Sequence, residues 1–322
     1  MRTRSEPEAA LAASRPAVPL LAFWRRAPAN LQGALWLFMG SVAVTVMFVG
    51  VKLLNGEINA LQVTFLRAGG GVLFLAPLYL RQNPGRLLTP KRPLAVLSRS
   101  VTATVAIALA YYSLARLPLA DAQAFAFSST LFLVPIAAIF LGEKIGPRRW
   151  SAAAIGFVGV VVMLRPTGAL NLGALAAVGA AFFMAVTLAQ VKLLTRDHQP
   201  NDVFFWGLTL MAVFSAVPAA LVWRTPDWSH AWPLAMTILG GALSQFSYVR
   251  AYSVGEAGAI APVEYTRLIL AALLGAMFFD ELPDALTYIG GALIVAATLY
   301  ITIREARLGL KKREAEEART VR

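Results

Sequence analysis

The tetrapeptide Val51-Lys52-Leu53-Leu54 returns 140 positions later as Val191-Lys192-Leu193-Leu194. Two further matches keep this offset, Gly33-Ala34-Leu35 with Gly173-Ala174-Leu175 and Tyr112-Ser113 with Tyr252-Ser253. After a shift of two positions, Gly142-Glu143 corresponds to Asp280-Glu281. These matches indicate that one sequence is written twice, with a first copy predicted at residues 33–164 and a second at residues 172–303.

The composition indicates a membrane protein. The chain of 322 residues is 58% hydrophobic and only 14% charged, whereas a soluble domain typically has about 25% charged residues. We identify ten apolar stretches, and a helix of about twenty residues crosses a hydrocarbon core of about 30 Å. The stretches lie near residues 33–53, 59–80, 93–114, 118–141, 148–164, 172–194, 202–223, 231–252, 258–279 and 285–303. The sequence therefore predicts an all-α, polytopic membrane protein with ten transmembrane helices.

Each copy contains an odd number of these stretches, so the second copy enters the membrane from the opposite side to the first. The predicted architecture is two inverted five-helix repeats, related by a pseudo-two-fold axis in the membrane plane. Two such halves can exchange conformations and open a central site to one face and then to the other. This organisation is typical of a transporter that works by alternating access.

The net charge of +12 raises the alternative of nucleic-acid binding, because basic chains often bind phosphate backbones. The distribution of the charges argues against it. If the N-terminus is cytoplasmic, 22 of the 29 Lys and Arg residues fall on the cytoplasmic side, as the positive-inside rule requires. We therefore predict a bacterial inner-membrane location with cytoplasmic N- and C-termini, and no nucleic-acid partner.

The two ends of the chain carry charge that does not belong to the spans. Residues 1–32 are rich in Arg, Ala and Pro and lack a cleavable apolar segment, which predicts a disordered cytoplasmic tail. Residues 304–322 alternate basic and acidic side chains at helical spacing, which predicts a cytoplasmic tail that extends the last span. The chain has no cysteine, so disulfides and thiolate metal sites are excluded, and we predict neither a metal nor a cofactor.

Four ionisable residues lie about 9 to 14 Å inside predicted spans by the helical rise, where a charge costs several kcal/mol unless it is paired or wet. They are Arg67, Arg99, Glu264 and Arg267. Glu264 and Arg267 are three positions apart and share one helix face, so they can pair. Two interpretations remain: a structural ion pair, or a pair in a central cavity that takes a proton or opens to hold a substrate.

Arg67 and Arg99 have no obvious partner within their own helices, although Asp121 is a candidate partner for Arg67. If both stay unpaired, the cavity is net positive and favours an anionic or carboxylate-bearing solute. The two copies differ at these charged positions, which we expect to determine specificity. At the offset of 140, the counterpart of Arg67 is Gly207, and those of Glu264 and Arg267 are Ala124 and Phe127.

Other side chains inside the spans suit a planar or polar metabolite, and with the four ionisable residues they form the predicted substrate site. Tyr111 is also explained as an interface anchor. The amides of Gln123 and Gln245 need partners, which are a substrate or a neighbouring helix. The full set of these additional candidates is Tyr111, Gln123, Phe125, Ser128, Trp206, Gln245, Tyr248 and Tyr265.

Several motifs resemble the EamA family of the drug/metabolite transporter superfamily. They are Ala110-Tyr111-Tyr112-Ser113-Leu114-Ala115-Arg116-Leu117-Pro118-Leu119-Ala120-Asp121-Ala122, Phe140-Leu141-Gly142-Glu143-Lys144, Ala261-Pro262-Val263-Glu264-Tyr265-Thr266 and Phe279-Asp280-Glu281-Leu282-Pro283. The resemblance covers residues 33–303. It implies ten helices with both ends cytoplasmic, and a central cavity lined by helices 3, 4, 8 and 9 with contributions from 1, 2, 6 and 7.

The resemblance also implies a function. Members of the family export or import amino acids, vitamins, nucleosides and related metabolites, and the motif around Glu264 resembles bacterial members that import riboflavin or S-adenosylmethionine. Arg267 departs from the family pattern, in which a neutral residue is common. We therefore predict a secondary transporter that moves a small organic metabolite across the inner membrane.

Two alternatives belong to other classes, a membrane-embedded enzyme and a non-transporting membrane scaffold. An enzyme would require clustered His, Asp or Glu residues at membrane depth, but His198 and His230 fall in predicted loops on opposite sides. The expected partners are the small-molecule substrate and the lipid bilayer. The sequence is compatible with a monomer and with a homodimer.

Overall fold

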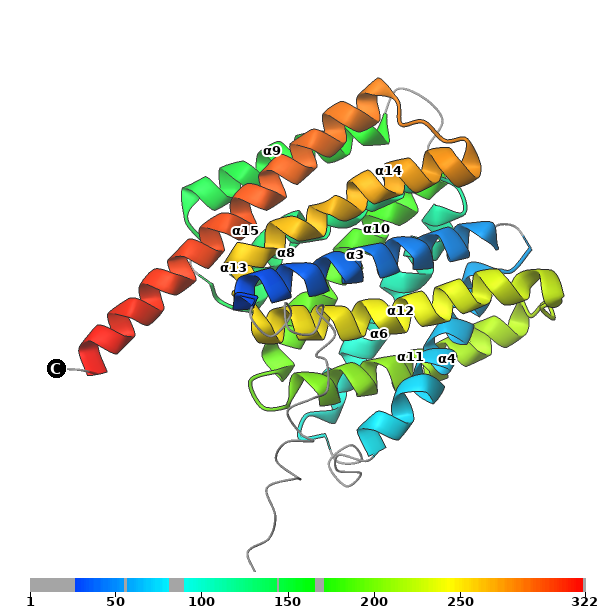
Figure 1. The fold of residues 1–322 in the computed structure, drawn as a ribbon, viewed down its shortest axis with the longest axis horizontal. Helices are drawn as coiled ribbons and strands as arrows, with labels where there is room; N and C mark the ends of the chain where they lie inside the picture. Colours follow the sequence, from blue (N-terminus) through cyan, green and yellow to red (C-terminus); the bar gives the residue numbers. More distant parts are fainter. Residues whose placement is uncertain (1–26, 55–56, 81–89, 144, 166–170, 321–322) are drawn as a thin grey trace, which may run out of the picture.

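The computed structural model describes residues 27–54, 57–80, 90–143, 145–165 and 171–320 (Figure 1). These residues form helices and no strands. Eight spans are single helices: α3 (Ala29–Leu53), α4 (Ala60–Leu80), α6 (Pro93–Leu114), α9 (Pro147–Leu164), α10 (Leu172–Leu194), α11 (Pro200–Leu221), α12 (Trp228–Val254) and α15 (Ala285–Thr320). Two are interrupted, the fourth as α7 (Leu119–Phe127) and α8 (Ser129–Phe140), and the ninth as α13 (Ala257–Ile260), the 3₁₀ helix η1 (Ala261–Tyr265) and α14 (Thr266–Phe279).

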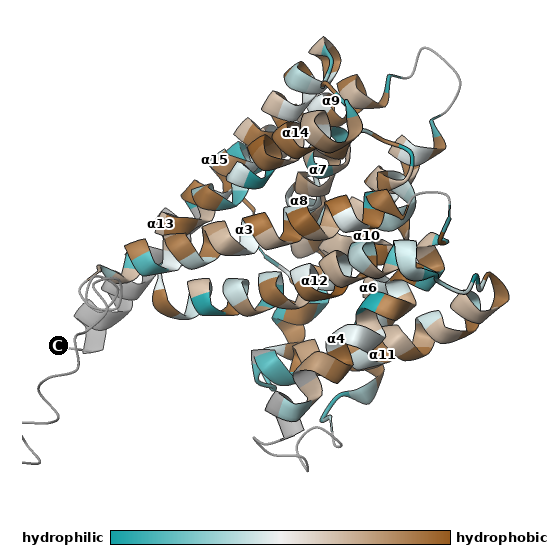
Figure 2. Cartoon of the chain, turned by 45° about the vertical axis from the view of Figure 1, so that its right-hand side comes forward, coloured by the Kyte–Doolittle hydropathy of each residue, from teal (hydrophilic) through white to brown (hydrophobic). Residues whose placement is uncertain are grey.

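The ten spans confirm the prediction from hydropathy, and most boundaries agree within a few residues. Eight of them are long and apolar enough to cross a membrane by themselves. The others are α4, whose apolar part is shorter, and α12. Figure 2 shows that hydrophobic residues predominate along the helices. The chain is therefore a polytopic α-helical membrane protein.

The two ends of the bundle are distinguished here by the terminal helices. On the side called the tail side, α3 begins at Ala29, α12 ends, and α15 projects out of the bundle as far as Thr320 (Figure 1). The opposite end, at which α3 ends at Leu53, is called the far side. The continuation of α15 beyond the bundle agrees with the helical extension predicted for the C-terminal residues. Most of the predicted N-terminal tail lies outside the described residues.

The helices pack mainly between the two copies. In the first copy α3 packs against α12, α4 against α11, α6 against α10, α7 against α14 and α9 against α15. The pairs α4/α11, α7/α14 and α9/α15 join equivalent helices, whereas the pseudo-two-fold exchanges α3/α12 with α6/α10. The two inverted repeats therefore interdigitate and form one bundle.

Glycines allow α3 and α12 to approach closely. A Cβ added at Gly50 would lie 2.7 Å from the carbonyl oxygen of Pro233, and one at Gly240 would lie 2.8 Å from that of Ala43. Both obstacles are backbone atoms, which cannot move aside as a side chain can. Small residues at such contacts are typical of helix packing in membranes.

The interruptions of the fourth and ninth spans are equivalent. The Ser128 hydroxyl donates to the carbonyl of Phe125 at 2.6 Å, and the Thr266 hydroxyl donates to that of Val263 at 2.6 Å. Both side chains bond a carbonyl three residues back, where the helix changes direction or type. Pro135, which predicts a kink by its missing N–H, lies inside α8 rather than at the interruption.

These interruptions also fix the register of the two copies. Ser128 and Thr266 are 138 positions apart, as are Glu143 and Glu281. The counterparts of Glu264 and Arg267 are therefore Ala126 and Ser129. The assignment to Ala124 and Phe127 is wrong because two residues are missing from the second copy before this point: the linker between α6 and α7 spans residues 115–118, and the one between α12 and α13 spans residues 255–256.

Candidate functional site

Two arginines from neighbouring helices lie along one face of α11. Arg67 of α4 places Nη1 3.9 Å from the sulfur of Met211. Arg99 of α6 packs against Gly207, because a Cβ built at Gly207 would lie only 1.3 Å from its Nη1. Gly207 and Met211 are four residues apart, so the two guanidinium groups contact α11 at adjacent turns, about 6 Å apart along its axis.

Neither arginine is neutralised within the part of the chain that the structure describes. No carboxylate there lies within ion-pair distance of Arg67 or Arg99, and the Nε atom of each is buried without a hydrogen-bond partner. Asp121, the candidate partner of Arg67, interacts instead with Thr287 and Arg165 at the far side. That pairing is therefore wrong, because Asp121 lies on the α7 face that points toward α15.

Two predicted residues join Arg67. Gln245 of α12 lines the same narrow crevice, of about 10 Å³, together with Gly241. Tyr111 is 1% exposed, experiences the charge of Arg67, and directs its hydroxyl to the sulfur of Met47 at 3.8 Å. In this conformation the helices close tightly around the Arg67 side chain.

A second group of predicted residues gathers at the interruption of the ninth span. Arg267 pairs with Glu264 at 3.3 Å and lies 4.2 Å above the ring of Phe127. Phe127 stacks on Tyr265 with ring centroids 4.8 Å apart and planes inclined by 21°. Phe127 and Tyr265 are equivalent in the two copies, so this stack lies close to the pseudo-two-fold axis. Tyr248 lies beside Arg267 and Ser41.

Several buried polar atoms in the spans have no hydrogen-bond partner among the described residues. Such atoms are uncommon in folded proteins, and each one suggests a role or an absent ligand. Within the described residues, those at membrane depth are Ser41 Oγ, Arg67 Nε, Arg99 Nε, both amide atoms of Gln123, Thr209 Oγ1, Tyr248 Oη and Arg267 Nε. They come from spans 1, 2, 3, 4, 7, 8 and 9, which largely coincide with the helices implied by the family resemblance.

Three predicted residues lie apart from the two groups. Trp206 packs with Val96, Leu194 and Val203 and meets His198 edge-on at 5.1 Å. The Ser128 hydroxyl is satisfied within its own helix, and Phe125 is 1% exposed at the base of a separate pocket. In this conformation the Ser128 hydroxyl bonds within its own helix, and Trp206 and Phe125 pack among apolar neighbours.

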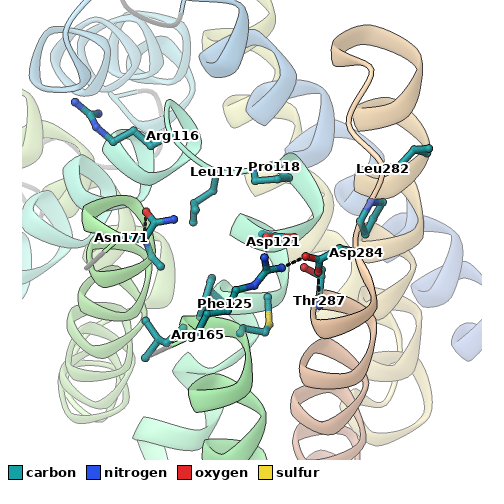
Figure 3. A pocket seen from close by; sticks show the side chains of 14 residues that line it. Arg116, Leu117, Pro118, Asp121, Phe125, Arg165, Asn171, Leu282, Asp284 and Thr287 are labelled. Atoms are coloured by element: carbon teal, nitrogen blue, oxygen red, sulfur yellow. Dashed lines mark hydrogen bonds and ion pairs between the residues drawn. The ribbon is translucent and has the colours of Figure 1, made fainter. Parts of the chain in front are cut away.

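The separate pocket lies at the far side and has a volume of about 430 Å³. Its wall combines the helices α7, α9, α10 and α15. Figure 3 shows Asp121, Arg165 and Asp284 directed toward one another, with an ion pair between Arg165 and Asp284. The pocket is displaced from the unpaired arginines. It is therefore separate from the residues around Arg67, Arg99 and Arg267, which are together called the central group.

Comparison with known proteins identifies the family. The model of the EamA-like transporter family matches residues 31–165 and again residues 171–303. The chain belongs to the EamA-like transporter family. This result confirms the resemblance indicated by the motifs around Glu143 and Glu281, and it shows that this EamA-like transporter is a multi-pass membrane protein that transports small metabolites.

Relatives of this EamA-like transporter carry different cargoes. It is 29% identical to a riboflavin transporter of Rhizobium johnstonii, over 85% of this chain and 92% of that one. It is 29% identical to an S-adenosylmethionine uptake transporter of Rickettsia felis, over 89% and 97% of the two chains. It is also 29% identical to a pseudopaline exporter of Pseudomonas aeruginosa, over 84% and 95%. The names cover both uptake and export.

A solved crystal structure shares the fold of this EamA-like transporter. The TM-score is 0.58 at 18% identity, and the match covers 86% of this chain and 98% of the other. At this identity the likeness concerns the fold alone. It supports the ten-helix arrangement on which the positions of the arginines depend.

Three residues of this site were missed from the sequence: Ser41, Thr209 and Phe127. Phe127 reads as an ordinary apolar residue of the fourth span, and nothing in its local pattern distinguishes it. The signal was the shift of two between Gly142-Glu143 and Asp280-Glu281, because that register places Phe127 opposite Tyr265.

Proposed function

We propose that this transporter carries a small organic metabolite with an anionic group, and that Arg67 and Arg99 bind that group. The observation that supports the proposal is the pair of guanidinium groups on adjacent turns of α11, each with a buried, unpartnered Nε and no carboxylate partner in the described chain. An unpaired charge at membrane depth is costly. A carboxylate or phosphate oxygen of the cargo would remove that cost, because guanidinium forms strong charge-assisted hydrogen bonds with both.

The second group suits the remainder of the cargo. Gly241, which faces Arg67, and Tyr248, which faces Arg267, are seven residues apart on α12, or about 10 Å along the axis. That spacing matches the length of a small metabolite. The Phe127–Tyr265 stack offers an aromatic surface, and the Glu264–Arg267 pair offers one group of each charge. A cargo with an anionic end and a planar or zwitterionic end therefore suits this arrangement.

We propose alternating access between the two inverted repeats, with the tail side in the cytoplasm of a bacterial cell and the far side outside the inner membrane. The loop charges support this orientation. One chain supplies every residue of the central group, so a monomer suffices for transport. Among the described residues, no three His, Cys, Asp or Glu side chains gather as they would at a metal site.

Counterflow in proteoliposomes tests the cargo class. The panel includes acidic, neutral and basic amino acids, organic acids and nucleotides, together with riboflavin and S-adenosylmethionine because relatives bear those names. We expect uptake of a solute with a carboxylate or phosphate. Arg67→Gln and Arg99→Gln should each reduce that uptake by about 10- to 100-fold, the equivalent of one or two charge-assisted hydrogen bonds.

The matched control is Arg250→Gln, which removes an exposed arginine that lies over Phe246 near the tail-side end of α12, outside the central group. It should retain uptake. Transport of a neutral solute alone, with both central variants as active as the parent chain, would contradict the proposed cargo class.

A further inference from the structure

Two lysine–glutamate pairs connect the repeats at opposite ends of the bundle. Lys52 at the end of α3 pairs with Glu281 after α14, and Lys192 near the end of α10 pairs with Glu143 after α8. Lys52 and Lys192 are the equivalent lysines of the repeated tetrapeptide, and Glu281 and Glu143 are equivalent glutamates. Each pair therefore joins the first copy to the second, and the pseudo-two-fold relates one pair to the other.

The two glutamates are held by equivalent helix ends. Asp280 and Gly142 both adopt left-handed backbone, with φ of 54° and 66°. The N–H of Glu281 then donates to the carbonyl of Gly275 at 3.1 Å, and that of Glu143 donates to the carbonyl of Ala137 at 3.2 Å. The same capping geometry thus aims a carboxylate at the neighbouring repeat on each side of the bundle.

The far-side pair also holds the linker between α6 and α7. Lys52 Nζ lies 2.5 Å from Glu281 Oε1 and donates to the carbonyl oxygen of Leu117 at 2.5 Å. Glu281 Oε2 accepts the N–H of Leu119 at 3.0 Å. The Lys52 side chain is only 7% exposed. These four residues, here called the far-side clamp, tie the ends of α3 and α14 to the linker.

The tail-side pair makes no such connection. Lys192 is 58% exposed, and in the described chain Glu143 also contacts Arg149 at 3.8 Å. The equivalent linker, between α12 and α13, bonds elsewhere: the N–H of Glu256 donates to the Asn30 side chain at 2.9 Å. In the described chain, no hydrogen bond joins this linker to Lys192 or Glu143. Among the described residues, the clamp is therefore formed at the far side and not at the tail side.

Each linker nevertheless rests on an equivalent helix start. A Cβ at Gly173, the start of α10, would lie 2.8 Å from Arg116 Cβ, and a Cβ at Gly33, near the start of α3, would lie 2.8 Å from Gly255 Cα. Each linker thus packs near the start of a helix, α10 for one linker and α3 for the other. The two ends differ in whether a lysine–glutamate pair also bonds the linker.

We infer that the two pairs are the two halves of one gate, and that Lys192 and Glu143 form a tail-side clamp when the far-side clamp opens. In that state Lys192 bonds the carbonyl of Gly255 and Glu143 accepts the N–H of Ala257, the positions equivalent to Leu117 and Leu119. The structure is then the conformation closed at the far side. This inference rests on the proposed alternating access, but not on the proposed cargo.

Cysteine pairs test the gate, because the native chain has no cysteine. A Cβ at Gly275 would lie 3.5 Å from Leu119 Cβ, within disulfide range, so Leu119→Cys with Gly275→Cys reports the far-side clamp. The equivalent pair for the opposite state is Ala137→Cys with Ala257→Cys. Both are oxidised in proteoliposomes without substrate, and closure is measured by the loss of maleimide-polyethylene glycol attachment. The far-side pair should close readily, and the tail-side pair should close in a smaller fraction of molecules.

Removing the charge of one glutamate should change the rate at which the tail-side cysteine pair closes, in opposite directions for the two glutamates. Glu281→Gln should raise the rate of tail-side closure by at least about tenfold, and Glu143→Gln should lower it by a similar factor while far-side closure persists. The control is Asp284→Asn, which breaks an exposed far-side ion pair with Arg165 outside the clamp and should change neither rate. Glu143 is partly exposed, so its variant remains informative even if the buried clamp cannot be altered without unfolding.

The tail-side result decides the inference. Absence of Ala137–Ala257 closure in every background, or identical closure with and without Glu143→Gln, would overturn it. Both readouts are independent of which solute is carried, so a wrong cargo assignment would leave them unchanged.

Discussion

At the scale of single residues, the copies differ most informatively at Gly207. Its counterpart in the first copy is Arg67, and the space left by the missing side chain holds the guanidinium of Arg99. The second copy therefore lacks its own arginine and makes room for one from the first. Both arginines, Arg67 and Arg99, consequently come from the first copy. In a symmetric chain each copy would supply the same arginines.

Gly207→Ala tests this arrangement. The new methyl group would displace Arg99, whose flexible end can move without unfolding the bundle. We expect normal expression and thermal stability, with uptake reduced by about tenfold or more because the anion site is misaligned. Gly69→Ala is the control, since no atom lies within 4 Å of its added Cβ. Equal uptake by both variants would argue against a role for Arg99 position.

The sequence could indicate which charges lie at membrane depth, but not how they pair. Hydropathy placed Arg67 and Arg99 inside spans, and the spacing of Glu264 and Arg267 predicted their contact, which the structure confirms. The proposed Asp121 contact failed because pairing across helices depends on their rotation, which a single sequence does not determine. Whether the twelve predicted residues bind a substrate stays a prediction.

At the scale of elements, the ends of the fourth and ninth spans use the same turn with different residues. Gly142 and Asp280 both have positive φ, a conformation that costs an L-residue about 1–2 kcal/mol relative to glycine. The second copy therefore carries strain that the first avoids.

Substitutions at these two positions should change the free energy of unfolding in opposite directions. We expect Asp280→Gly to raise the free energy of unfolding by up to about 1 kcal/mol, and Gly142→Ala to lower it by about 1–2 kcal/mol. Thermal unfolding in detergent measures both. A stabilising Gly142→Ala would show that the left-handed turn does not persist in the folded chain.

The start of α12 predicts a pH dependence. The hydroxyl of Ser229 donates to the Asp227 carboxylate and lowers its pKa below the ordinary value of 3.8, with help from the Ser229 N–H and His230. A lowered pKa means that ionised Asp227 stabilises the fold above the unfolded value, and that this contribution disappears as the pH falls through the folded value.

Asp227→Asn isolates that effect, because asparagine also caps helices but carries no charge. The stability difference between the parent chain and the variant should be constant near neutral pH and should shrink below about pH 4. Thermal unfolding at a series of pH values measures it. A difference that grows toward acid pH would mean that the carboxylate is destabilising.

Element positions were the most predictable part of the fold, because bilayer thickness fixes the length of each span. The interruption at Ser128 was not predictable from its residue type, since most serines in membrane helices bond their own backbone without ending the helix. Pro135 was the stronger local signal, yet α8 accommodates it.

At the scale of the whole molecule, the repeat predicted the inverted architecture, and its imperfect register located the central stack and the gate. The pairing of helices between the copies could not be predicted from the sequence. The repeated residues show that the copies are alike, but they do not show that each helix packs against the other copy. The orientation in the membrane rests on loop charge alone.

Single cysteines test that orientation. Thr225 is exposed on the far side and Gln199 on the tail side. In intact cells, an impermeant maleimide should label Thr225→Cys and spare Gln199→Cys, which should react only after the membrane is permeabilised. Labelling in the reverse order would place the termini outside the cell.

The packing between copies has a consequence for biosynthesis. Every helix of the first copy finds its main partner in the second, so the first five spans enter the bilayer before any of those partners has been synthesised. Until α10 to α15 follow, Lys52 has no Glu281 and the glycines of α3 have no α12 to meet. The helices of the first copy therefore gain their main partners one after another as the second copy is synthesised, beginning when α10 reaches α6 and ending when α15 reaches α9.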